Sequence, residues 1–212
     1  MRMIIMKLFV VILFASMIYV NYIANSKPLG GITTGEISDK YNTLFTPSGF
    51  TFSIWGLIYL LIFVFVISYT LGNINSTTNI ELLGVLFIIT CILNISWLFC
   101  WHYDRILLST IVMVILLVSL LMILQLTNPE GIVKATFSIY AGWISVALIA
   151  NISILLFKHD ITFFMNNEYL SFYSVLIISL LIGGYMVVIE KNYYYGGVFL
   201  WAYVGIISKF IR

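Results

Sequence analysis

The chain has 212 residues, of which 62% are hydrophobic and only 8% are charged. A soluble domain carries about 25% charged residues, so this composition excludes an ordinary water-soluble protein. The formal net charge of +2 provides no broad basic surface, and we expect no nucleic acid among the partners. Two cysteines are too few for a disulfide framework.

Seven apolar runs are long enough to cross a bilayer, which takes about 20 residues of helix. Runs such as IVMVILLVSLLMIL are apolar on every face and lack the alternation of an outer-membrane β-strand. The sequence therefore predicts an all-α, polytopic transmembrane bundle of about seven helices. The predicted spans are residues 4–23, 49–71, 82–101, 106–126, 132–157, 169–189 and 193–210.

The first run also has the basic and apolar regions of a secretory signal peptide. A cleaved signal needs a site of small residues, which Ala24 and Ser26 match only loosely. We therefore favour a first helix that is retained.

The one long connection, residues 24–48, carries two prolines, three glycines and four charged residues. It is too polar to enter the hydrocarbon, and loops of this length are usually functional or disordered. Pro47 near its end suits a first helical turn. We expect the loop to fold over the bundle as a lid, with Phe45 and Phe50 on its apolar underside.

Seven spans would place the termini on opposite sides of the membrane. The side with the long loop and the C-terminus holds six basic residues, and the other side holds four. The positive-inside rule then places the long first loop and the C-terminus in the cytoplasm, although Arg2 and Lys7 argue for the opposite orientation. We expect an integral membrane protein with this orientation.

The ionisable residues fall near the ends of the predicted helices, where their side chains reach the interface. Pumps and proton relays instead need such residues at mid-membrane, so proton-coupled transport is disfavoured. His102 and Asp104 are fewer ligands than zinc requires, and we expect no metal site and no catalytic residue. Cys91 and Cys100 lie nine residues apart and are interpreted as packing residues.

Aromatic and amide residues instead recur at helical spacing on three of the predicted helices. A single such stripe is more typical of helix packing than of a ligand site. Asn94 and Asn151 are costly in hydrocarbon, so we expect them to find partners inside the bundle. Three stripes together suit a flat, largely apolar ligand. The stripes are Phe52, Trp55, Tyr59 and Phe63; Asn94, Trp97 and Trp101; and Tyr140, Trp143, Ala147 and Asn151.

The small residues of the fifth predicted span are a separate feature. Ser138, Ala141, Gly142 and Ser145 permit close approach of a neighbouring helix. They equally suit the contact face of a dimer.

Three segments resemble the TspO/MBR family, the tryptophan-rich sensory proteins related to the translocator protein or peripheral-type benzodiazepine receptor. They are FTPSGFTFSIWGLIYLL from Phe45, LNISWLFCWHYDR from Leu93 and FSIYAGWISVALIANI from Phe137. The resemblance covers residues 1–157 and implies a five-helix core, with residues 158–212 as a two-helix C-terminal extension. The chain departs from the family pattern where Ser48 follows Pro47, where Leu44, Phe45 and Phe50 replace loop tryptophans, and where Ile139 replaces a proline.

The resemblance implies a non-enzymatic membrane receptor or carrier for a planar hydrophobic ligand such as a porphyrin or haem. It implies no required cofactor, a homodimer as the assembly, and the cytoplasmic membrane of a prokaryote as the location. The expected ligand-binding residues, including the two phenylalanines of the lid, are Phe45, Phe50, Trp55, Tyr59, Asn94, Trp97, Tyr140, Trp143 and Asn151. The alternatives are a seven-helix secondary transporter and a non-catalytic structural subunit of a membrane complex.

Overall fold

The computed structural model describes residues 1–26, 29–41, 44–74, 79–127, 131–158 and 167–211. These residues form eight α-helices and no β-strand, which confirms the predicted all-α class. The helices are α1 (Arg2–Ser26), α2 (Thr34–Lys40), α3 (Ile54–Leu71), α4 (Ile80–His102), α5 (Ile106–Leu126), α6 (Ile132–Lys158), α8 (Glu168–Val188) and α9 (Tyr193–Ile211). The 3-10 turns η1 (Leu29–Gly31) and η2 (Gly49–Ser53) precede α2 and α3.

Six segments in the described part of the chain are long and apolar enough to cross a membrane. They contain α1, α3, α4, α5, α6 and most of α8. The seventh predicted span also forms a helix, α9, but it falls outside this set. Its first two turns hold three tyrosines and two glycines, which lower its hydropathy.

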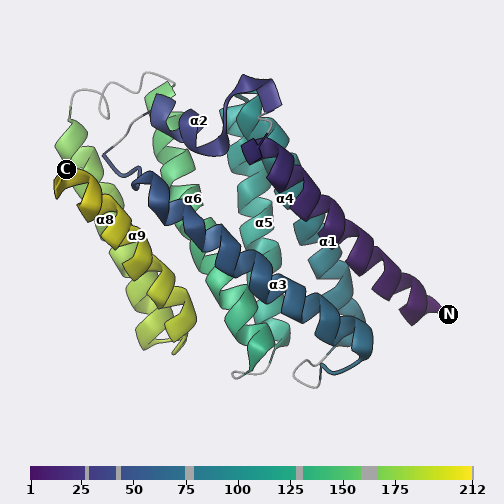
Figure 1. Cartoon of the computed structure of the whole chain (residues 1–212). Coiled ribbons are helices and arrows are strands. Elements are labelled where there is room, and N and C mark those ends of the chain that lie inside the picture. Colours follow the sequence, from purple (N-terminus) through teal and green to yellow (C-terminus); the bar gives the residue numbers. More distant parts are fainter. Residues whose placement is uncertain (27–28, 42–43, 75–78, 128–130, 159–166, 212) are drawn as a thin grey trace.

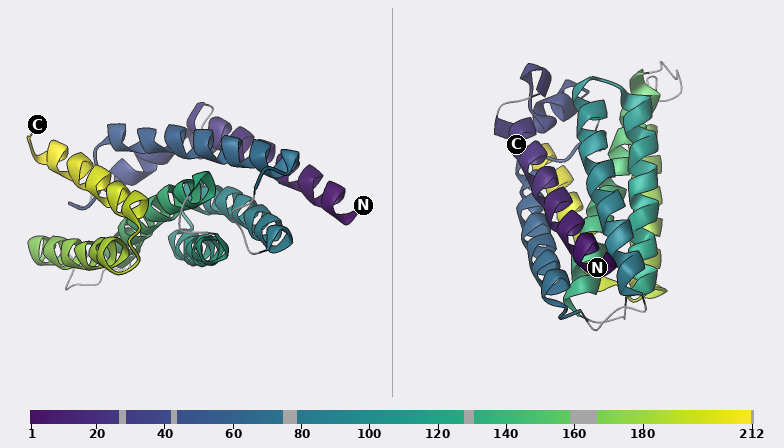
Figure 2. Two further views of the ribbon diagram at one scale, coloured as in Figure 1. Left: turned by 90° about the horizontal axis from the view of Figure 1, so that it is seen from below. Right: turned by 90° about the vertical axis from the view of Figure 1, so that its right-hand side faces the viewer.

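The helices form one bundle in which α1 and α3 lie along one side of α4, α5 and α6 (Figures 1 and 2). Close contacts join α4 to α5, α5 to α6, and α1 to α4. The α8 and α9 pair stands at the edge farthest from α1, where α9 packs on α6. Figure 1 shows α2 at the end of the bundle that also holds the C-terminus.

The half of the bundle away from α2 is filled by aromatic side chains. Phe65 of α3, Phe87 of α4 and Phe137 of α6 are fully buried. The ring centroid of Phe65 lies 5.0 Å from that of Phe87 and 4.9 Å from that of Phe137. This close-packed cluster fixes the spacing of the three helices, and the same helices diverge around hollows nearer α2.

The long first loop folds over one end of the bundle, as its polarity predicts. Its helix α2 begins with a capping box, in which Thr33 N–H donates to the Glu36 carboxylate at 2.6 Å and Glu36 N–H donates to Thr33 Oγ1 at 3.2 Å. The hydrogen bonds with Thr33 lower the pKa of Glu36 and outweigh a small opposing effect of burial, so this pKa lies below its ordinary value. Trp101 Nε1 of α4 donates to the Thr34 carbonyl at 3.2 Å, which ties α2 to the bundle.

The small-residue face of α6 packs against α9 of the same chain. A Cβ at Gly142 would lie 3.1 Å from the Tyr195 carbonyl, so glycine is what allows this approach. Ser145 Oγ lies 2.5 Å from the Tyr195 hydroxyl, and Asn192 Nδ2 donates to Ser138 Oγ at 2.8 Å. This face is therefore covered within the chain, and the expected homodimer stays a prediction that rests on the family resemblance.

Candidate ligand cavity

Two adjoining hollows lie beneath α2 and are lined in common by residues of η2, α3 and α4. The larger has a volume of about 320 Å³ and reaches toward α1, where Asn21 and Asn25 line it. The smaller has a volume of about 50 Å³ and reaches toward α5 and the second half of α6. Four residues line both hollows, so the two form one site: Thr34, Phe52, Trp55 and Trp97.

Trp55 is the centre of the aromatic wall. Its ring stacks on Tyr59 with centroids 5.4 Å apart, and it meets Tyr140 and Trp143 edge to face at 5.9 and 6.4 Å. Phe52 contacts Trp143 edge to face at 5.8 Å. Each such pair contributes about 0.5–1.5 kcal/mol beyond area burial, so the wall is rigid before any ligand arrives. The structure thus brings Trp55, Tyr59, Tyr140 and Trp143 together.

A chain of amide and phenol groups supports this wall from behind. Asn21 Nδ2 of α1 donates to Asn94 Oδ1 at 2.8 Å, and Asn94 Nδ2 donates to the Tyr140 hydroxyl at 2.9 Å. The Tyr59 hydroxyl donates to Asn21 Oδ1 at 2.5 Å. Together these bonds join four helices, and neither Asn94 nor Tyr140 is among the described residues that line the two hollows.

Asn151 belongs to a second polar cluster, at the wall of the smaller hollow. Thr110 Oγ1 donates to Asn151 Oδ1 at 3.0 Å, and Asn151 Nδ2 donates to Ser109 Oγ at 2.8 Å. The amide is thereby satisfied by two hydroxyls of α5, as the cost of a bare amide in hydrocarbon requires.

The two phenylalanines of the loop lie elsewhere. Phe45 is buried, with 3% of its surface exposed, and Phe50 is 44% exposed. Neither is among the described residues that line the two hollows. Phe50 instead contacts Trp201 of α9 edge to face, with centroids 5.6 Å apart.

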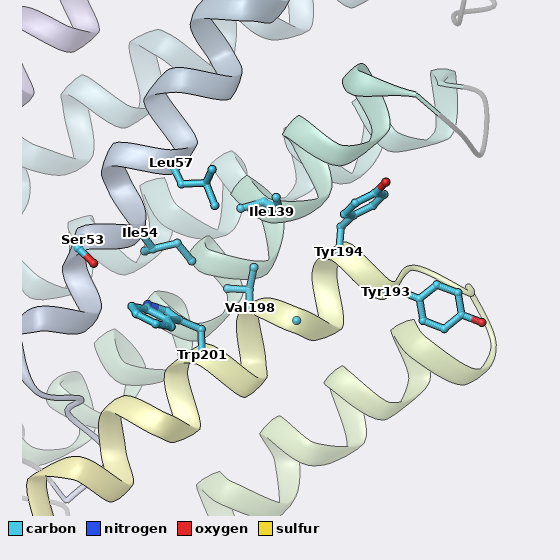
Figure 3. A pocket seen from close by; sticks show the side chains of 9 residues that line it. Ser53, Ile54, Leu57, Ile139, Tyr193, Tyr194, Val198 and Trp201 are labelled. Carbon is cyan, nitrogen blue, oxygen red and sulfur yellow. The ribbon is translucent and has the colours of Figure 1, made fainter.

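Trp201 forms one wall of a separate groove, with a volume of about 480 Å³, between α3, α6 and α9. Figure 3 shows Trp201 and Val198 of α9 facing Ile54 and Leu57 of α3, with Tyr193 and Tyr194 toward the far end. The groove is apolar. It lies on one side of the first turns of α3, and the two hollows lie on the other side.

Many residues that line the hollows are absent from the nine expected ligand-binding residues, among them Asn21 and Thr34. Asn21 lies in the first apolar run, and the argument that singled out Asn94 and Asn151 applies equally to it. Thr34 lies in a polar loop without periodicity, so only the folded chain shows that α2 places it over the cavity.

His102 and Asp104 do not meet at one site. His102 is buried, and its Nδ1 lies 2.8 Å from the Leu98 carbonyl. Asp104 instead pairs with Lys40 and Lys158 and accepts a hydrogen bond from Tyr41. In the described part of the chain, no three histidine, cysteine, aspartate or glutamate residues cluster in a way that would hold a metal ion.

A sequence model of the TSPO-like protein family matches residues 7–211. The chain belongs to this family. The match extends from α1 to α9 and so includes both the expected five-helix core and the C-terminal pair. No curated protein and no solved structure matches the chain. With six candidate spans, this TSPO-like protein is an integral membrane protein.

Proposed function

We propose that this TSPO-like protein is a non-catalytic membrane receptor or carrier that binds a planar hydrophobic ligand, such as a porphyrin or haem, beneath α2. One observation carries the proposal: two adjoining hollows share the aromatic side chains of Phe52 of η2, Trp55 of α3 and Trp97 of α4. Flat apolar rings gain both area burial and ring stacking against such walls.

The polarity of the lining supports a largely apolar ligand. Among the described residues, no charged side chain lines either hollow. The polar groups there are amides, hydroxyls and indole N–H groups, which orient a ligand without requiring it to be charged. The proposed role needs no cofactor, because binding alone is the function.

The size of the cavity bears on which ligand fits. At about 320 Å³, the larger hollow is at the low end of the range of about 300–1,000 Å³ for small-molecule pockets. A full tetrapyrrole therefore requires α2 to move outward. The ion pair between Lys40 of α2 and Asp104 is about half exposed and therefore weak, so the hydrogen bond from Trp101 Nε1 to the Thr34 carbonyl is the stronger tie that this movement has to break.

The test is titration of the purified protein with protoporphyrin IX, followed by porphyrin absorbance and tryptophan quenching. We expect saturable binding. Trp55→Ala should weaken it about tenfold or more, because Trp55 lines both hollows and its ring can no longer stack on the porphyrin. Trp201→Ala is the matched control, since Trp201 lines the separate groove and should leave the affinity unchanged. Absence of saturable binding, or equal losses in the two variants, would refute the proposal.

A further inference from the structure

Two polar groups of the cavity have no hydrogen-bond partner. They are Trp97 Nε1 and Thr34 Oγ1, on residues that are 5% and 8% exposed. Both residues line both hollows, one from α4 and the other from α2. Buried polar groups of proteins are nearly always paired, so two unpaired groups at one place require an explanation.

The neighbouring indole shows what a partner for Trp97 would be. Trp101 stacks on Trp97 with centroids 6.1 Å apart, and its Nε1 donates to the Thr34 carbonyl. The Thr34 carbonyl therefore pairs with the indole N–H of Trp101, whereas the indole N–H of Trp97 has no such acceptor. An indole N–H only donates, so the group that completes Trp97 must be an acceptor.

The charge of that acceptor follows from the surroundings. The described lining residues carry no cation. An ionised carboxylate would lose its water there with no opposite charge to replace it, whereas an uncharged carbonyl loses far less. A carbonyl oxygen also has two lone pairs, enough for both Trp97 and Thr34.

We propose that the ligand presents an uncharged carbonyl-type oxygen to this pair of residues. Trp97 Nε1–H and the Thr34 hydroxyl both donate to that oxygen, which orients the ring between the two hollows. This inference rests on the proposed function and adds the chemistry of the ligand's polar edge.

Three porphyrins with the same ring and different edges test the inference. Protoporphyrin IX dimethyl ester carries uncharged carbonyls, protoporphyrin IX carries carboxylates, and etioporphyrin carries alkyl groups only. The measured quantity is the ratio of the dissociation constant of Trp97→Phe to that of the wild type, for each porphyrin. Partitioning of a porphyrin into detergent cancels in this ratio.

We expect a ratio of about ten for the dimethyl ester, because one buried hydrogen bond is lost. We expect a ratio near one for etioporphyrin and for the diacid, whose carboxylates stay outside the cavity. Thr34→Val, which keeps the shape of the side chain, should weaken only the ester as well. Trp201→Phe should give a ratio near one for all three.

Each outcome decides the question. If none of the porphyrins binds to the wild type, the proposed function itself fails. If they bind but the ester ratio equals the etioporphyrin ratio in both Trp97→Phe and Thr34→Val, no ligand oxygen meets this pair and the inference is overturned. A diacid ratio as large as that of the ester would show a charged acceptor and overturn it too. Should Trp97→Phe fail to fold, Thr34→Val alone decides between these results.

Discussion

Asn94 joins three helices through one side-chain amide. It accepts a hydrogen bond from Asn21 of α1 and donates one to the Tyr140 hydroxyl of α6, with no exposed surface. Replacing it with leucine keeps the size but leaves a donor and a hydroxyl unpaired in an apolar interior. We expect Asn94→Leu to lower the free energy of unfolding by about 1–3 kcal/mol.

The measurement is unfolding in detergent, followed by tryptophan fluorescence. Ser96→Ala is a matched control in the same helix, because its hydroxyl bonds only to the Ile92 carbonyl one turn away. That variant should stay within about 0.5 kcal/mol of the wild type. Equal stabilities of the two variants would mean that the amide chain does not hold the helices together.

Single residues also show how far the sequence leads. The spacing of aromatic residues assigns Trp55 and Trp97 to the stripes of two predicted helices, the family resemblance implies that both belong to the cavity, and both line the hollows. Periodicity says which face a residue shares, but it does not say whether the side chain lines a space or supports those that do. Asn94 and Tyr140, which the resemblance implies line or support the cavity, hydrogen-bond to each other and are not among the described residues that line the hollows.

At the scale of elements, α9 explains why hydropathy alone misjudges a helix. Its tyrosines and glycines lower its apolar character, yet several of them make the contacts with neighbouring elements. Tyr195 lies against Ser145 of α6, and Gly205 lies against Thr51 of η2. The composition is therefore set by packing against protein as well as by exposure to lipid.

Gly205 makes the tightest contact among the glycines of α9. A Cβ at this position would lie 2.0 Å from Thr51 Oγ1 and 2.9 Å from Thr51 Cγ2, and Thr51 is fully buried. The Ser48 N–H donates to the Gly205 carbonyl at 3.1 Å, so the backbones are held together as well. Gly205→Ala should force η2 and α9 apart and cost about 1–3 kcal/mol.

Thermal unfolding of the variants in one detergent measures this effect. Gly197→Ala lies in the same helix with no atom within 4 Å of the added Cβ, so it controls for helix propensity. We expect Gly197→Ala to be neutral or stabilising, since alanine is the better helix former. A loss of stability in Gly197→Ala as large as in Gly205→Ala would rule out the steric explanation.

At the scale of the whole molecule, the bundle has a packed half and a hollow half, and the first loop closes the hollow half. The loop is fastened at Asp104, in the corner between α4 and α5. Asp104 Oδ2 lies 3.0 Å from Lys158 Nζ and 3.6 Å from Lys40 Nζ, and the Tyr41 hydroxyl donates to Oδ1. One carboxylate thus links the end of α2 to α6.

The pKa of Asp104 gives this fastening a pH dependence. Partial burial raises the pKa, but the hydrogen bonds from Tyr41 and Lys158 and the charges of Lys158 and Lys40 outweigh it, so the net pKa is lowered. The pKa of Tyr41 is raised, mainly because the phenol is partly buried and also because it donates to the negatively charged Asp104. A lowered carboxyl pKa stabilises the closed loop above the ordinary value of 3.8, and this stabilisation is lost as the pH falls through the folded-state pKa.

The lid assignment of the loop is tested through this carboxylate. Asp104→Asn should speed backbone hydrogen exchange across residues 34–41 roughly two- to fivefold at pH 7, because exposed ion pairs contribute about 0.2–1 kcal/mol. The ratio of variant to wild-type rates should fall toward one as the pH drops from 3.8 through the lower folded-state pKa of Asp104, where the wild type loses the same charge. Glu190→Gln, whose carboxylate accepts from Tyr185 of α8, is the control and should give a ratio near one.

The variant should also take up and release protoporphyrin IX faster, with little change in the folded fraction, because the substitution weakens only the attachment of α2 over the cavity. Saturating ligand should slow exchange across residues 34–41 in the wild type and the variant alike, since Thr34 lines both hollows. If the ligand leaves that exchange unchanged while it binds, entry does not pass beneath α2. The segment would then be a linker, and the route to the cavity would run between the helices from the membrane.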